Sequence, residues 1–114
     1  MSELLDEVIS KLSNALRRRF DDYKGLYLFG NCLTGDVKED EDIEIVAIFD
    51  NEDKAKREKI WPLIGKIETD LNVCIDLYPY TMEAFQKDED LYNEVMEEGI
   101  FYNPLGIRQN KGLG

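Results

Sequence analysis

The sequence predicts an α+β fold in which helices cover a small mixed β-sheet. Residues 3–20 carry apolar side chains at three- and four-residue steps, the spacing of an amphipathic helix. Short apolar runs bounded by Gly, Pro and acidic residues indicate strands between the helical segments. The predicted order is helix, strand, strand, helix, strand, helix and a last short strand, which suits α+β or mixed α/β packing.

The first half of the chain contains one helix and two strands. The helix at 3–20 is followed by an apolar strand at 26–29, which should end at Gly30. Residues 31–41 are polar and acidic, as expected of a loop. The next strand is predicted at 43–49, and the acidic residues after it should end it.

The second half adds helices on both sides of a third strand. Residues 54–71 have a helical pattern, and Pro62 predicts a kink or a break just before it. A strand at 72–78 should be stopped by Pro79. Residues 88–98 predict another helix, which a glycine ends.

The C-terminal segments are short. Thr81 is expected to cap a short helix, and residues 100–102 are expected to form a short edge strand. With 114 residues, the chain has the length of one domain. We expect that domain to span residues 1–106, with residues 107–114 as a frayed tail.

Composition excludes several classes of function. The net charge of −11 disfavours nucleic-acid phosphates and anionic membranes, and it favours divalent cations or a basic protein as partners. The absence of His excludes Ser-His-Asp and Cys-His hydrolases and His-ligated zinc. We see no membrane span and no leader, and we expect Cys32 and Cys74 to be reduced, half-buried thiols of a cytoplasmic protein.

Three carboxylates lie in or beside predicted strands. Asp42 and Glu44 are two positions apart, so a strand would point both side chains to the same face. Asp76 lies in the third strand between two apolar residues. Charges in apolar strands cost free energy unless something compensates them, and Mg²⁺ prefers carboxylate oxygens. The three residues are therefore candidate metal ligands and catalytic residues.

Gly30 and Asn31 supply a second candidate feature, a nucleotide-binding turn. They follow the first buried strand directly. Glycine permits a close approach of the backbone to a ligand, and backbone N–H groups in such a turn can bind phosphate oxygens.

Each of these residues also has a structural interpretation. Asp42 ends a run of charges that suits a solvated loop, and Glu44 could face solvent on a half-exposed strand. Asp76 could protect an edge strand from aggregation, and Gly30 could be an ordinary turn. The joint pattern, more than any single residue, favours a functional site.

That joint pattern resembles the signature of the DNA polymerase β-like nucleotidyltransferases, and the minimal members of that superfamily in particular. The signature is Gly-Ser, ten residues, then Asp-x-Asp or Asp-x-Glu, with a third acidic residue on a later strand. Here Gly30-Asn31 is followed after ten residues by Asp42-Ile43-Glu44, and Asp76 lies in a later strand. Asn31 replaces the usual Ser, and Glu44 replaces the commoner Asp. The resemblance implies a nucleotidyltransferase fold similar to the polymerase β palm.

The resemblance also implies an activity. Asp42, Glu44 and Asp76 would hold Mg²⁺, and Asp76 would help deprotonate the acceptor hydroxyl. Gly30 and Asn31 would hold the triphosphate, with ATP as the expected nucleotide. Many proteins of this size in the family are antitoxins encoded beside an HEPN-type toxin. The expected reaction is transfer of a nucleoside monophosphate to a hydroxyl of such a partner protein.

Two other functions remain open. The same fold could be an inactive module that binds a protein, through an exposed apolar patch involving Trp61, Phe85 or Phe101, although aromatic residues are more often core. It could also bind a nucleotide as a sensor without transferring it. A homo-oligomer is compatible with each of these functions.

Overall fold

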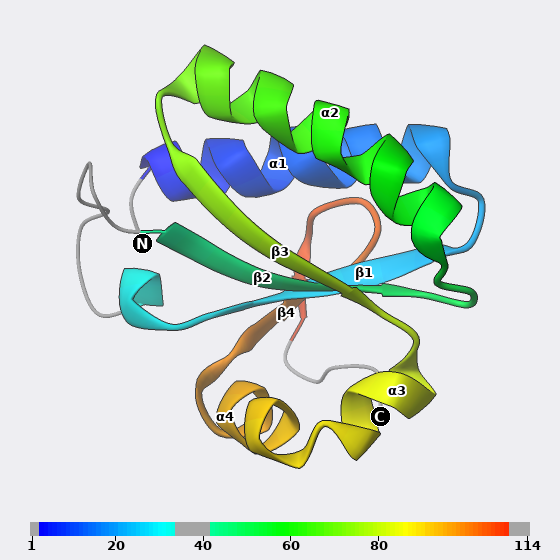
Figure 1. Cartoon of the computed structure of the whole chain (residues 1–114). Coiled ribbons are helices and arrows are strands. Elements are labelled where there is room, and N and C mark those ends of the chain that lie inside the picture. Colours follow the sequence, from blue (N-terminus) through cyan, green and yellow to red (C-terminus); the bar gives the residue numbers. More distant parts are fainter. Residues whose placement is uncertain (1–2, 34–41, 110–114) are drawn as a thin grey trace.

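The computed structural model describes residues 3–33 and 42–109, and their helices flank a five-stranded sheet on both faces (Figure 1). Helices α1 and α2 lie on one face, and α3 and α4 lie on the other (Figure 1). The elements in chain order are α1 Glu3–Arg19, β1 Tyr23–Phe29, the 3-10 turn η1 Asn31–Leu33, β2 Asp42–Phe49, α2 Lys54–Leu71, β3 Cys74–Tyr80, α3 Met82–Lys87, α4 Glu89–Glu98, β4 Ile100–Tyr102 and β5 Arg108–Gln109.

The sheet has the strand order β3-β2-β1-β4-β5. Strands β2 and β3 are parallel, with α2 as the crossover between them, and the other neighbours are antiparallel. A parallel pair needs such a long connection, and α2 provides it. The predicted α+β class and the mixed sheet are both confirmed.

Each face of the sheet has its own apolar core. The face under α1 and α2 buries alternate residues of β1 and β2, including Leu26, Leu28 and Ile45. The opposite face buries the residues between them, and two of the aromatic residues considered for an exposed patch, Phe85 and Phe101, belong to this second core. Trp61 differs from both, because 48% of it is exposed.

Strand β1 begins earlier than the sequence predicts. Its register against β2 shifts between Tyr23 and Gly25, so the strand contains an irregularity there. Gly25 has φ +124°, and a Cβ at this position would lie 2.6 Å from the Tyr102 carbonyl oxygen. The predicted strand starts only after this glycine, at residue 26, whereas Gly25 lies within β1 and lets the strand come close to β4.

Neither internal proline ends its element. Helix α2 is continuous through Pro62, so a break there is wrong. Pro62 is exposed, so water can reach the carbonyl that the missing N–H leaves free. Strand β3 likewise continues through Pro79 to Tyr80, because β3 is at the edge of the sheet and needs no donor on its outer side.

The C-terminal end of the described chain extends the sheet. Strand β4 exists as predicted, but it is not an edge strand, because β5 pairs with it. We expected residues 107–114 to fray; Arg108 and Gln109 instead pair with Tyr102 and Phe101, and residues 110–114 lie outside the described residues.

The two cysteines are not joined in a disulfide, and they lie in different environments. Cys32 is buried, and its thiol donates to the Phe29 carbonyl oxygen at 3.3 Å, whereas Cys74 is exposed. The prediction that both are half-buried is therefore wrong. Within the described residues, no helix has the length and apolar character that a bilayer crossing requires.

Candidate active site

The three predicted carboxylates lie on one face of the sheet. In the parallel pair β2–β3, Glu44 is directly opposite Asp76. Asp42 is two residues before Glu44 on β2 and therefore points to the same side. The next residue on this face of β2, Val46, belongs to the core under α3 and α4. The face that these helices cover is therefore apolar further along β2 and acidic where β2 begins.

The electrostatics of Glu44 indicate that these groups act on one another. Its pKa is raised, first by desolvation and then by the negative charges of Glu94, Asp76 and Asp42. Glu94 comes from α4 and was not predicted as a site residue. Only the packing of α4 against the sheet brings it near Glu44, so no spacing in the sequence indicates it.

Asp76 has a hydrogen-bond partner on its own strand. The Tyr78 hydroxyl donates to Asp76 Oδ2 at 2.7 Å, since residues two apart on a strand share a face. This bond, together with desolvation and the charges of Asp76, Glu44 and Asp42, raises the pKa of Tyr78 to about 12. Tyr78 is thus a second site residue that the sequence analysis missed.

Gly30 lies against the acidic face and is held in a conformation that suits glycine. Its φ is +86°. A Cβ at Gly30 would lie 1.8 Å from Glu44 Oε2, so the glycine leaves room for that carboxylate. This close approach involves a protein side chain, whereas the sequence analysis expected it to involve a ligand.

Asn31 is exposed and begins the turn η1, which the Leu33 N–H closes by donating to the Gly30 carbonyl oxygen at 3.2 Å. The residues expected to bind nucleotide therefore adjoin the candidate metal ligands. Residues 34–41, the rest of the predicted loop, lie outside the described residues.

The carboxylates fit a divalent cation by their chemistry. They are hard oxygen donors. Desolvation and then the neighbouring negative charges raise the Glu44 pKa, and a bound cation would offset the repulsion among these charges. Among the described residues, however, no group of three or more His, Cys, Asp or Glu side chains is arranged so that it could hold a metal ion. A cation held by all three carboxylates would therefore require these side chains to rearrange.

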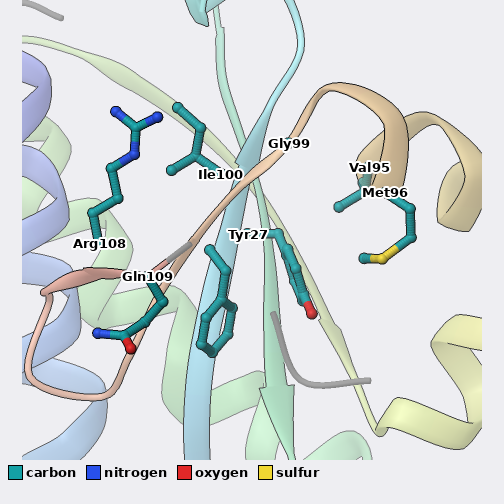
Figure 2. A pocket seen from close by; sticks show the side chains of 8 residues that line it. Tyr27, Val95, Met96, Gly99, Ile100, Arg108 and Gln109 are labelled. Atoms are coloured by element: carbon teal, nitrogen blue, oxygen red, sulfur yellow. The ribbon is translucent and has the colours of Figure 1, made fainter. Parts of the chain in front are cut away.

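A separate pocket of about 230 Å³ lies elsewhere on the molecule. Figure 2 shows Val95 and Met96 of α4 on one side of it and Arg108 and Gln109 of β5 on the other. Its lining includes no carboxylate. It therefore does not belong to the candidate active site.

A mixed sheet that carries this motif at the start of β2 indicates a class of protein, and the comparison with protein families identifies that class. Residues 9–102 match the family described as the nucleotidyltransferase domain. The chain belongs to this family, and the matched range contains all five predicted site residues. No curated protein sequence matches the chain.

Several solved structures that are similar to this chain come from toxin–antitoxin complexes. A chain in the crystal structure of a mutant toxin–antitoxin complex, MntA-HpeT, superposes with a TM-score of 0.58 and 23% identity, covering 82% of this chain and 70% of that one. A toxin–antitoxin structure with AMP-PNP gives a TM-score of 0.55 and 24% identity, covering 82% of this chain and 68% of that one. A chain in a complex of the tri-AMPylated Shewanella oneidensis HEPN toxin with MNT antitoxin gives a TM-score of 0.51 and 22% identity, covering 82% of this chain and 66% of that one. These similarities confirm the fold.

Proposed function

We propose that this protein is a Mg²⁺-dependent nucleotidyltransferase that moves AMP from ATP to a hydroxyl of a partner protein. The observation that carries the proposal is the placement of Asp42, Glu44 and Asp76 on one sheet face beside Gly30. In a family defined by nucleotidyl transfer, this arrangement puts acidic oxygens next to a turn whose backbone can approach phosphate.

Each residue has a role in the proposed reaction. Asp42, Glu44 and Asp76 would hold Mg²⁺, which when bound neutralises phosphate charge and helps to position the triphosphate. The turn at Gly30 and Asn31 would bind phosphate oxygens. Asp76 would accept the proton of the acceptor hydroxyl, whose oxygen attacks the α-phosphorus while pyrophosphate leaves.

The proposed acceptor is a HEPN-like toxin in the cytoplasm, with this chain as its antitoxin. The solved complexes that share the fold include an AMPylated HEPN toxin and a structure with AMP-PNP. The charge of −11 suits a protein acceptor with a basic or neutral surface better than a nucleic acid. A homo-oligomer of this chain is compatible with the proposal.

A second candidate is a catalytically inactive module that binds the same kind of partner. Two observations favour it: the lack of a ready three-ligand group among the described residues, and the exposure of Trp61, an aromatic side chain typical of interfaces. Nucleotide binding separates the two candidates.

The test is calorimetric titration of ATP into the protein with and without Mg²⁺. We expect Mg²⁺-dependent binding in the wild type and its loss in Asp42→Asn/Glu44→Gln. The matched control is Glu7→Gln/Asp21→Asn, which removes the same two charges from exposed positions outside the candidate site and should bind like the wild type. Absence of binding in the wild type would overturn the transferase proposal and leave the binding module.

A further inference from the structure

Tyr78 holds its hydroxyl against the carboxylate that serves as the base in the proposed reaction. Its oxygen lies 2.7 Å from Asp76 Oδ2, the carboxylate proposed to accept the acceptor's proton. Its ring packs against Phe29, with centroids 6.3 Å apart, and Phe29 directly precedes Gly30. The phenol therefore contacts the proposed base and packs against the residue that precedes the proposed phosphate-binding turn, and Tyr78 is only partly buried.

We propose that Tyr78 is a site of self-modification, at which the protein transfers AMP from ATP to its own tyrosine. The inference rests on the proposed function. The Tyr78 oxygen would form a bond to the α-phosphorus, the bond from that phosphorus to the bridging oxygen would break, and pyrophosphate would leave. The phenol proton would pass to Asp76, to which it is already directed. The reaction needs a nucleoside triphosphate and no further reactant.

Self-modification would block the site that the protein is proposed to use to modify a partner. An AMP group on Tyr78 would occupy the space beside Asp76 and exclude an acceptor hydroxyl from it. A copy modified in this way would therefore be unable to modify its partner.

Tyr80 provides a matched control on the same strand and face. Its hydroxyl also donates to a carboxylate, Asp88 Oδ2, at 2.6 Å, and it is also partly buried. Its ring packs against Phe85, and Asp88 lies between α3 and α4, so Tyr80 is directed to another carboxylate. The two tyrosines thus share chemistry and exposure and differ in whether they face the candidate site.

The test is incubation of the purified protein with ATP and Mg²⁺, followed by intact-mass measurement and peptide mapping. We expect one AMP adduct in the wild type and in Tyr80→Phe, mapped to Tyr78 in both. We expect no adduct in Tyr78→Phe or in Asp42→Asn/Glu44→Gln. Because the transfer is within one molecule, the modified fraction at a fixed time should not depend on protein concentration.

Three results would overturn the inference. The adduct could persist in Tyr78→Phe, it could map to another residue of the wild type, or it could be absent although calorimetry shows Mg²⁺-dependent ATP binding. The third result leaves the proposed function standing, whereas a failure of ATP to bind removes both. Peptide mapping of the wild type is independent of whether the Tyr78→Phe variant folds.

Discussion

Gly30 is the residue at which backbone conformation and the candidate site depend on each other most directly. Its φ of +86° is unfavourable for any residue with a side chain, and a Cβ there would meet the Glu44 carboxylate. We expect Gly30→Ala to lower the free energy of unfolding by about 1–3 kcal/mol and to displace Glu44. Urea unfolding measures the first effect, and Mg²⁺-dependent ATP binding measures the second.

Gly65 offers the control for that substitution. It lies inside α2, and a Cβ there would have no neighbour within 4 Å. Gly65→Ala should therefore raise the free energy of unfolding, by about 0.5–1 kcal/mol, and leave ATP binding unchanged. If both alanine variants behave alike, the role assigned to Gly30 is wrong.

Glu44 should make stability depend on pH in a definite direction. Desolvation and the charges of Glu94, Asp76 and Asp42 raise its pKa above the ordinary value of 4.5. Between pH 4.5, the ordinary pKa, and the raised pKa of the folded state, the folded protein binds more protons than the unfolded chain. The free energy of unfolding therefore falls as the pH rises through that window. We expect Glu44→Gln to be more stable than the wild type at pH 7 and to lose this pH dependence. Urea unfolding of both proteins from pH 4 to pH 8 checks this prediction. If Glu44→Gln were less stable than the wild type at pH 7, the raised pKa assigned to Glu44 would be wrong.

The N-terminus of α2 shows how one side chain sets the start of an element. Asp53 has an extended backbone, and its Oδ1 accepts from the Lys56 N–H at 2.8 Å. We expect Asp53→Ala to lower the free energy of unfolding by about 1 kcal/mol, and Asp53→Asn to retain most of the wild-type value because the amide oxygen can still cap. Chemical denaturation of the three proteins tests this. If Asp53→Ala and Asp53→Asn lowered the free energy of unfolding equally, the effect would be due to the lost charge and not to the lost cap.

The elements that the sequence predicted correctly are those with local signals. Helix α2 has the predicted bounds, 54–71, because an acidic cap precedes it and apolar residues recur along one face. The continuation of β3 through Pro79 to Tyr80 had no local signal in the sequence, because it depends on the position of β3 at the edge of the sheet. There Glu68 Oε2 accepts from the outward N–H of Ile75 at 2.9 Å, and Pro79, four residues on, offers no N–H on that same side. Both features suit an edge strand that avoids pairing with other chains.

The same division applies to the candidate site. Period-two spacing predicted that Asp42 and Glu44 share a face, and the register of β2 with β3 adds Asp76 to that face. Glu94 could not be predicted, because its place near Glu44 depends on how α4 packs. Tyr78 could not be predicted as a site residue either. Its two-residue spacing from Asp76 indicates a place in the site only when β3 is known to pair with β2.

Charge is distributed unevenly over the whole molecule. Helices α1 and α2 carry nine of the chain's 14 basic residues, whereas α4 carries five acidic residues and no basic one. The three candidate carboxylates lie on the sheet face that α4 partly covers. The acidic side of the molecule is thus the side of the candidate site, and a cation or a basic partner surface would be attracted there.

This concentration of negative charge predicts how Mg²⁺ affects the stability of the whole fold. A cation that binds the folded carboxylates more tightly than the unfolded chain raises the free energy of unfolding, by about 2.7 kcal/mol at a concentration 100 times its Kd. We therefore expect MgCl₂ to raise Tm more than NaCl does at the same ionic strength. Asp42→Asn/Glu44→Gln should show a higher Tm than the wild type without Mg²⁺, because repulsion is relieved, and little response to Mg²⁺. The Glu7→Gln/Asp21→Asn control should respond like the wild type. An equal response in all three proteins would mean that Mg²⁺ acts only by screening the net charge of −11 and has no site among these carboxylates.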